Sequence, residues 1–505
     1  MYRFFHHVVV FFQRLRAFFR QTHSLHTARF ADLHELSELL TYRLDETGLL
    51  LGISHFKQFL HVRPTKTRRE LGNLLAVAPT RGGKGLLATS QLLTWPQSVI
   101  VNDVKGELFT QTAGYRATLG KVYVIDPTGI GNCLDPLQDR RTEDALVSAA
   151  THLLYEPDER DKVFTQRAIT MLTQLFLAAR IEGYPPLSYV RSLIRSPLPD
   201  VAARLHALDP ELATQLLKAR FEEVNFDNKF LISAWETVTS RLQPLLTETV
   251  VRSLAGTDFT AQEIMCSTQP VTVYLRWPER DLLALSPLVR LVWGSLIDGL
   301  ISTYDQAQGR HCKPVLLLID EAGRTAIPSL ADHATTVVGR GISLWIAIQS
   351  LSQLNVVYGT QRATILRDNM ETRLFYRPND QETAEYLERC LGRRSDFAHS
   401  QTIRHGEETS EGRMEQGIPL MTSQEIKQMP DEDIIGFHRN VPPFRAKRMD
   451  WRHIPLLVER QLIPPPALSP LPTRDLELPL LGQAVPAFPN GFIDPDALID
   501  SDSLH

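Results

Sequence analysis

A short apolar run that breaks into a glycine-rich turn is the feature that most constrains this chain. Residues 74 to 77 have the length and composition of a buried strand, residues 79 to 85 read Pro-Thr-Arg-Gly-Gly-Lys-Gly, and helix-forming residues follow. Such a turn directs several backbone N–H groups and the positive end of a helix dipole to one place, where they favour phosphate. We expect the phosphate to be held by Thr80, Arg81, Gly82, Gly83, Lys84 and Gly85.

The turn departs from the phosphate-loop pattern G-x-x-x-x-G-K-[ST] at two positions. Ala78 stands where the first glycine is expected, and Gly85 stands where a serine or threonine is expected. The second departure bears on chemistry because that hydroxyl normally ligates Mg²⁺. Glycine turns are common, so the pattern alone leaves a nucleotide site and a purely structural turn as alternatives.

Length, charge and cysteine content limit the class of protein. The 505 residues suffice for two or three domains, and 43% hydrophobic residues is an ordinary globular composition. A net charge of -4 argues against a protein coated by nucleic acid over its whole surface, but it leaves a basic channel inside an assembly open. The four cysteines form no C-x-x-C pair, so neither a zinc site nor a disulfide framework is indicated.

The first 22 residues are predicted to form a basic amphipathic helix. Its apolar arc consists of Phe4, Phe5, Val8, Phe11, Phe12, Leu15, Phe18 and Phe19. Contact of residues 3–20 with a membrane surface and docking on the protein's own core are both compatible with this pattern. No run approaches the roughly 18 apolar residues of a membrane span. We therefore expect a cytoplasmic protein, with peripheral contact to the cytoplasmic face of the inner membrane as an option.

The rest of the chain predicts an α/β fold interrupted by helices. Apolar runs at 74–77, 98–101 and 122–125 alternate with helical stretches, which indicates a mostly parallel sheet. A polar loop is expected at 393–417 and an edge strand at 434–437. The predicted parts are 1–22 (amphipathic helix), 23–68 (linker or packing arm), 69–141 (first part of a nucleotide-binding domain), 142–262 (inserted all-α domain), 263–455 (second part) and 456–505 (Pro-rich disordered tail).

Two acids form the second chemical element. Asp320 and Glu321 directly follow the apolar run 315–319, at the carboxyl end of a predicted buried strand. In P-loop ATPases a strand of this kind brings one acid to Mg²⁺ and a second to the attacking water. Any strand must leave the core through polar residues, so this pattern gains weight only from the phosphate turn upstream.

Two polar residues flank the next predicted strand, 342–348. Arg340 lies on a glycine-flanked turn before it, from which a guanidinium can reach the nucleotide of a neighbouring subunit. Spacing alone favours the alternative of a solvent-exposed arginine. Gln349 follows the strand and is placed to sense a γ-phosphate, with a structural amide as the alternative.

With these residues in view, the chain resembles the coupling proteins of conjugation and type IV secretion, the TraG/TraD-like group. The resemblance covers about residues 70 to 450. It is carried by the segments 78–85, 95–116, 272–278, 316–324 and 339–359 and by the region of Asn369. Members of that group usually carry amino-terminal transmembrane helices, and none is predicted here.

The resemblance implies a RecA-like P-loop NTPase domain with an inserted all-α domain, assembled as a homo-hexamer that uses ATP and Mg²⁺. It implies Lys84 as the phosphate-loop lysine, Asp320 as the acid on the magnesium side and Glu321 as the catalytic base. Arg340 matches the arginine finger and Gln349 the motif after the next strand.

Three functions follow as hypotheses. The first is an ATP-driven translocase whose partners are DNA, a relaxase or other secreted cargo, and type IV secretion components. The second is a cargo receptor or scaffold that binds nucleotide and hydrolyses it poorly, for which Gly85 is the motivating residue. The third is a related ring ATPase that pumps DNA.

Overall fold

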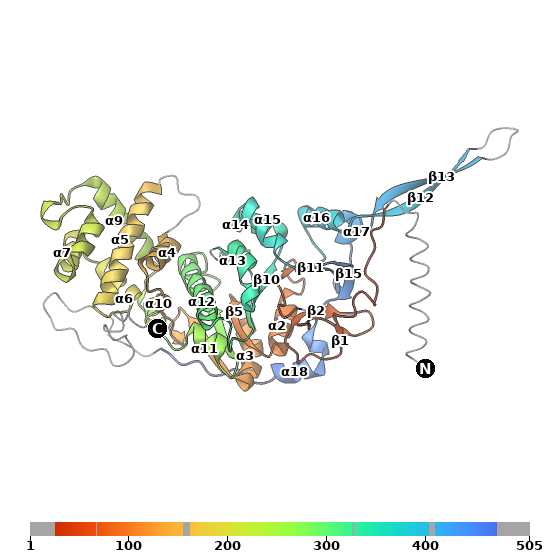
Figure 1. Ribbon diagram of the computed structural model, residues 1–505, viewed down its shortest axis with the longest axis horizontal. Helices are drawn as coiled ribbons and strands as arrows, with labels where there is room; N and C mark the ends of the chain where they lie inside the picture. Colours follow the sequence, from red (N-terminus) through yellow and green to blue (C-terminus); the bar gives the residue numbers. More distant parts are fainter. Residues whose placement is uncertain are drawn as a thin grey trace, which may run out of the picture. The chain divides into compact units, whose positions relative to one another are not determined.

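The computed structural model describes residues 26–66, 68–154, 162–325, 327, 329–402 and 410–471 (Figure 1). The chain divides into two compact units. The first comprises Met1–Tyr123, Ala261–Leu283 and Leu300–Ala467, and the second comprises Val124–Thr260, Ala284–Gly299 and Leu468–His505. The predicted amphipathic helix and the tail beyond residue 471 lie outside the described residues.

A twisted sheet with a parallel centre forms the first unit, which confirms the predicted α/β class. The strand order is β1-β3-β2-β15-β14-β11-β4-β10-β9-β5-β8-β6, and the neighbours from β11 to β8 are parallel. The strands are β1 (Leu40–Thr41), β2 (Leu49–Ile53), β3 (Phe59–Val62), β4 (Leu74–Val77), β5 (Ser98–Asp103), β6 (Lys121–Asp126), β8 (Val271–Arg276), β9 (Val315–Ile319), β10 (Ile342–Ile348), β11 (Thr372–Tyr376), β14 (Asp433–His438) and β15 (Val441–Lys447).

Strand β4 lies inside the sheet and feeds the glycine-rich turn. Ala76 pairs with Ala347 of β10 on one side and with Leu374 of β11 on the other. All four β4 residues are buried, as expected for a strand that is covered on both faces. Because the central strands are parallel, the residues that follow β4, β5, β9 and β10 meet at one edge of the sheet.

The helices of the first unit connect these strands. They are α2 (Lys84–Thr94), α3 (Glu107–Leu119), α11 (Ala261–Cys266), α13 (Leu330–Thr336), α14 (Leu351–Tyr358), α15 (Thr360–Asp368), α16 (Gln381–Leu391), α17 (Ser423–Lys427) and α18 (Pro455–Gln461), with 3₁₀ turns η2 (Val338–Arg340) and η3 (Trp451–His453). Helix α12 (Ser286–Ala307) starts in the second unit and ends in the first.

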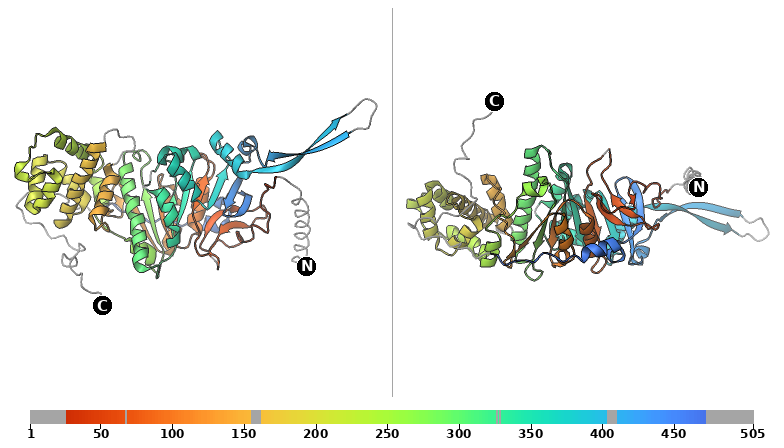
Figure 2. Two further views of the ribbon diagram at one scale, coloured as in Figure 1. Left: turned by 45° about the horizontal axis from the view of Figure 1, so that its top comes forward. Right: turned by 90° about the horizontal axis from the view of Figure 1, so that it is seen from below.

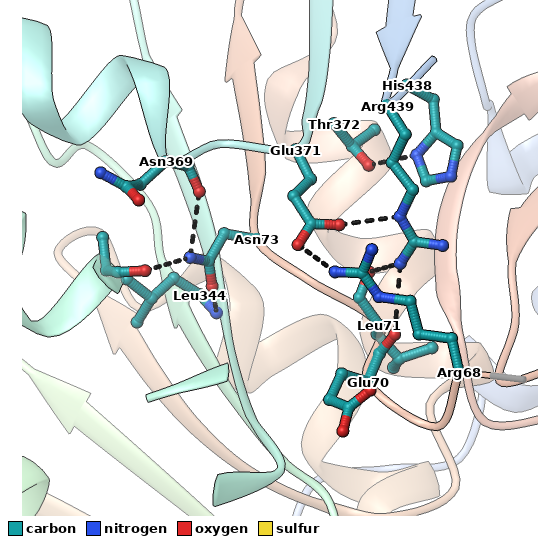
Figure 3. A network of polar contacts seen from close by, with 11 residues as sticks. Arg68, Glu70, Leu71, Asn73, Leu344, Asn369, Glu371, Thr372, His438 and Arg439 are labelled. Atoms are coloured by element: carbon teal, nitrogen blue, oxygen red, sulfur yellow. Dashed lines mark hydrogen bonds and ion pairs between the residues drawn. The ribbon is translucent and has the colours of Figure 1, made fainter. Parts of the chain in front are cut away.

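A polar network at the opposite edge fixes the beginning of β11 (Figure 3). The Glu371 carboxylate accepts a hydrogen bond from Arg439 Nε at 2.8 Å and pairs with the guanidinium of Arg68. Thr372 Oγ1 lies 2.8 Å from His438 Nδ1. Burial, together with the nearby Arg439, lowers the pKa of His438 to about 4, so its imidazole is neutral at pH 7.

Asn73 fixes the beginning of β4 in the same region (Figure 3). Its Nδ2 donates to the carbonyls of Ala334, in α13, and Asn369, at 2.9 and 3.2 Å. Its Oδ1 accepts from the Leu344 amide of β10 at 3.0 Å. The fully buried Asn73 side chain therefore ties the phosphate-loop strand to three other segments of the chain.

Three predictions about the first unit were wrong. The segment predicted as a linker or packing arm, 23–68, contributes β1, β2 and β3 to the sheet, because the apolar residues 49–51 are completely buried there. Strand β14 lies between β11 and β15 and is not an edge strand. The predicted polar loop 393–417 contains β12 (Arg393–Thr402) and β13 (Ser410–Pro419), an antiparallel pair that forms a separate two-stranded sheet (Figure 2).

The tail prediction was wrong at its start. Residues 455–461 form α18, with Pro455 at a first-turn position where proline is favoured. Leu457 is fully buried, and Arg460 donates to the Leu93 carbonyl of α2 at 2.7 Å and pairs with Asp45. These contacts hold α18 against the first unit, so the sheet-containing unit extends into the predicted tail.

The second unit is mainly helical (Figure 1). It contains α4 (Glu143–Leu154), α5 (Lys162–Ile181), α6 (Pro186–Leu193), α7 (Leu198–Leu208), α8 (Pro210–Leu217), η1 (Phe221–Glu223), α9 (Lys229–Leu242) and α10 (Glu248–Ser253), with the short β7 (Ile130–Gly131) paired to the end of β6. The apolar side chains of α5, among them Leu172, Leu175 and Phe176, are buried. The unit starts at Val124, earlier than the predicted insert, and takes in residues 284–299.

Candidate nucleotide-binding site

The turn after β4 has the backbone of a phosphate loop. Gly83 has a φ of 112°, a conformation that side chains disfavour, and it immediately precedes α2. Within the described residues, no side chain caps this helix. Its first backbone N–H groups are therefore available to an anion, which the helix dipole also favours.

A chain of hydrogen bonds joins two predicted site residues, Glu321 and Gln349, to the turn. Lys84 Nζ donates to Glu321 Oε1 at 3.2 Å, and Gln349 Nε2 donates to Glu321 Oε2 at 3.1 Å. Thr80 Oγ1 donates to Gln349 Oε1 at 3.2 Å. Glu321 itself is buried and has a φ of 60°, an unusual conformation for this residue type. Residues that follow β4, β9 and β10 thus meet at one point.

Asp320 has the surroundings expected of a metal ligand. Its Oδ1 atom is buried and has no hydrogen-bond partner within the described part of the chain. Burial, and next the neighbouring Glu321, raise the pKa of Asp320 to about 6. A cation would satisfy this oxygen, so the residues present fit Mg²⁺.

The donor set also fits the way Mg²⁺ is bound beside nucleotides. No cluster of three or more His, Cys, Asp or Glu in the described ranges could hold a metal ion by itself. Mg²⁺ in nucleotide sites commonly takes one or two protein ligands and completes its shell with phosphates and water. Gly85, at the position of the usual hydroxyl, has no atom within 4 Å of where a Cβ would lie. The missing hydroxyl is therefore not a consequence of crowding.

The end of β5 adds two side chains that were not among the predicted site residues. Asn102 Nδ2 donates to the backbone carbonyl of Asp320 at 3.0 Å and so fixes the backbone at the proposed magnesium ligand. The buried Asp103 accepts a hydrogen bond from the Phe109 amide at 2.7 Å and shapes the turn that leads into α3. Burial raises the pKa of Asp103. The sequence signal was present, because polar residues follow a buried strand, but the adjacency of β5 to β9 was needed to interpret it.

Arg340 is not brought to this site within one chain. It precedes β10, whereas Gln349 follows the same strand, so the two residues lie at opposite ends of a seven-residue strand. A strand of that length spans roughly 23 Å. The Arg340 guanidinium forms a bidentate ion pair with Asp305, in which Nε donates to Oδ1 at 2.8 Å and Nη2 donates to Oδ2 at 2.9 Å. If Arg340 contacts a nucleotide, that nucleotide would have to be bound to another subunit.

Comparison with known proteins shows the family. Residues 57–465 match the model of the family described as type IV secretory system conjugative DNA transfer. The chain belongs to this family. That membership agrees with the expected coupling-protein resemblance and extends it to the strand β3 at its amino-terminal end.

Curated relatives match most of the length of this chain. It is 26% identical over 448 residues to the conjugal transfer protein TraG of Escherichia coli, covering 79% of this chain and 70% of TraG. It is 25% identical over 437 residues to protein VirD4 of Rhizobium radiobacter, covering 81% of this chain and 62% of VirD4. The chain therefore spans between 62% and 70% of these two relatives.

Solved structures of a coupling protein share the fold. The plasmid coupling protein TrwB in complex with ADP and Mg²⁺ superposes with a TM-score of 0.60 at 18% identity, covering 84% of this chain and 94% of TrwB. Its trigonal form in complex with sulphate gives a TM-score of 0.61, with 83% and 93% covered. The chain thus shares the fold of this coupling protein, in agreement with the RecA-like fold that the resemblance implies. None of its described helices has the length and apolar character of a membrane span.

Proposed function

We propose that this protein is the ATP-hydrolysing coupling protein of a conjugation or type IV secretion system. The observation that carries the proposal is that Lys84 and Gln349 both donate hydrogen bonds to the Glu321 carboxylate beside the glycine-rich turn. In a member of the conjugative DNA transfer family, this arrangement favours nucleotide hydrolysis over a structural turn. The TrwB structures with ADP and Mg²⁺ and with a non-hydrolysable ATP analogue support the same ligands here.

The roles we assign follow from the geometry. The backbone of residues 80–85 and the Lys84 ammonium bind the phosphates, which requires Lys84 to exchange its contact with Glu321 for a phosphate oxygen. Glu321 then holds the attacking water and takes its proton, while Gln349 fixes the orientation of the carboxylate. Asp320 would hold Mg²⁺, which neutralises phosphate charge when bound.

The partners we propose are DNA, a relaxase or other secreted cargo, and the components of the secretion channel. A homo-hexameric ring would bring Arg340 of one subunit to the nucleotide of the next, consistent with its position away from its own site. Residues 3–20 would contact the cytoplasmic face of the membrane through their apolar arc and arginines.

A second candidate is a nucleotide-binding scaffold with little hydrolysis. Gly85 favours it, because the position offers room for a hydroxyl and the chain supplies none. Catalysis depends on charge neutralisation at the γ-phosphate, and one missing ligand of the metal weakens it.

ATP hydrolysis by the purified full chain, with and without single- and double-stranded DNA, separates the two candidates. Hydrolysis that DNA stimulates and that Lys84→Ala removes is the expected result. Nucleotide binding without hydrolysis at any DNA concentration would favour the scaffold. Binding that is equal in the wild type and in Lys84→Ala would contradict both candidates.

A further inference from the structure

The segment 102–107, Asn-Asp-Val-Lys-Gly-Glu, comprises the end of β5 and the turn into α3. Asn102 and Asp103 hold the backbone of the acids and of the turn into α3. Gly106 has a φ of 71° and lies against the Arg276 guanidinium, where a Cβ would come within 3.1 Å of Nη2. The backbone is therefore tightly defined on both sides of Lys105, and it sets the direction in which this side chain leaves the turn.

Lys105 is directed to the candidate site. Its Nζ lies 4.0 Å from Glu321 Oε1, and its side chain is 41% exposed. The two oxygens of Glu321 already accept hydrogen bonds from Lys84 and Gln349, at 3.2 and 3.1 Å. At 4.0 Å, Lys105 lies beyond hydrogen-bonding distance of Glu321 Oε1.

The charges at this edge of the sheet call for a second cation near the phosphates. Asp103, Asp320 and Glu321 bring three carboxyl groups together, and Lys84 and Lys105 bring two ammonium groups. A nucleoside triphosphate adds further negative charge. Gly85 supplies no hydroxyl that could hold a metal ion beside the phosphates. The simpler alternative is that Lys105 only offsets the charge of the acids. That role would make no distinction between a triphosphate and a diphosphate.

We propose that Lys105 is a second catalytic cation that contacts the γ-phosphate of bound ATP. This inference rests on the proposed ATP hydrolysis. In that reaction the oxygen of a water forms a bond to the γ-phosphorus while the bond to the bridging β,γ-oxygen breaks, and Glu321 accepts the proton of the water. ADP and inorganic phosphate leave. Lys105 keeps its proton throughout and stabilises the charge on the γ-phosphoryl oxygens.

The contact predicts a selective loss of affinity. Lys105→Met in the full chain should weaken binding of a non-hydrolysable ATP analogue with Mg²⁺ by about tenfold, the low end for a contact to a charged group that is partly exposed. The affinity for ADP with Mg²⁺ should be unchanged. Turnover should fall on the order of 10²-fold, as for other single donors to developing charge. Lys105→Arg, which keeps the charge, should retain the preference for the triphosphate.

Lys121→Met is a matched control, because Lys121 is an exposed lysine at the start of β6 whose partner is Glu263. It should leave both affinities and turnover at wild-type values. Equal melting temperatures of the Lys105 and Lys121 variants would exclude a folding defect. An unchanged ratio of the two affinities in Lys105→Met would overturn the inference about Lys105 while leaving ATP hydrolysis intact. A wild type that binds the analogue without hydrolysing it would refute the proposed function, whereas one that binds neither nucleotide would refute both.

Discussion

Lys84 Nζ lies 3.2 Å from Glu321 Oε1, and both side chains are more than nine-tenths buried. The lysine that binds phosphate and the acid that activates water are thus paired with each other before any nucleotide enters. Burial of this pair makes it costly to remove one partner alone. A phosphate that takes Lys84 away also frees one oxygen of Glu321 for a water molecule, so binding and activation are linked by this contact.

Lys84→Ala should lower nucleotide affinity by at least about 10²-fold, since the main cation at the phosphates is lost. It should also lower the free energy of unfolding by about 1–3 kcal/mol, because Glu321 keeps Gln349 but loses a buried partner. The double variant Lys84→Ala/Glu321→Gln should recover part of that stability. Calorimetric titration and denaturant unfolding measure the two effects, and an unchanged ATP affinity would rule out the phosphate-loop assignment.

Glu321→Gln should bind ATP with wild-type affinity and lose turnover by at least about 10²-fold, the lower range for a general base. The amide keeps the size of the side chain and its contact with Gln349 but cannot accept the proton of water. Glu263→Gln is a suitable control, because Glu263 pairs with Lys121. Wild-type turnover in Glu321→Gln would mean that Glu321 has only a structural role.

Gly85→Ser should fold normally and strengthen the Mg²⁺ dependence of nucleotide binding. A Cβ at residue 85 meets nothing within 4 Å, and the new hydroxyl stands where P-loop proteins place a metal ligand. Gly85→Ala adds the same carbon without the hydroxyl and should not change the Mg²⁺ dependence. Identical Mg²⁺ titrations for the serine and alanine variants would show that position 85 does not reach the metal.

Arg340→Ala should inactivate the protein. In mixed assemblies of wild-type and variant subunits, turnover should fall by more than the fraction of variant subunits. Arg340 lies at the far end of β10 from its own site, so it acts on a neighbour if it acts on nucleotide. Asp305→Asn, which weakens its present ion pair, should preserve turnover. Activity that falls only in proportion to the variant fraction would argue against a role across subunits.

Acid should destabilise the first unit partly through His438. The pKa of the folded-state imidazole is about 4, lowered from 6.5 by burial and by Arg439, whereas the unfolded chain takes up a proton below about pH 6.5. The contribution is complete above that pH and is lost as the pH falls toward 4, by at most roughly 3 kcal/mol. His438→Asn should therefore reduce the loss of stability between pH 7 and 5. His55→Asn, at an exposed position, should leave that loss unchanged.

The central sheet could be predicted because its strands carry continuous apolar runs. The runs 315–319 and 342–348 are both buried. The polar residues that follow each run could be placed at one edge of the sheet from the parallel arrangement alone. Strand β2 was missed because its apolar run lies among polar and charged residues, without the alternating helices that mark a parallel sheet. The β12–β13 pair was missed because its sequence is polar and lacks the apolar runs that mark the central strands.

The candidate site was predicted in part for the same reason. Lys84, Asp320 and Glu321 belong to local patterns, and a local pattern is visible in one stretch of sequence. Lys105 and Asn102 belong to the site only because β5 pairs with β9. That pairing joins residues more than 200 positions apart, which no spacing rule along the chain can supply.

The position of β4 has a thermodynamic consequence for ligand binding. Parallel ladders hold this strand on both sides, and Asn73 fastens its beginning to three other segments. The loop that follows is therefore ordered by folding itself, before any anion arrives. Nucleotide binding then loses little backbone entropy, and its free energy goes into contacts with the phosphates. We expect a heat-capacity change on binding that is small compared with that of a loop which folds around its ligand.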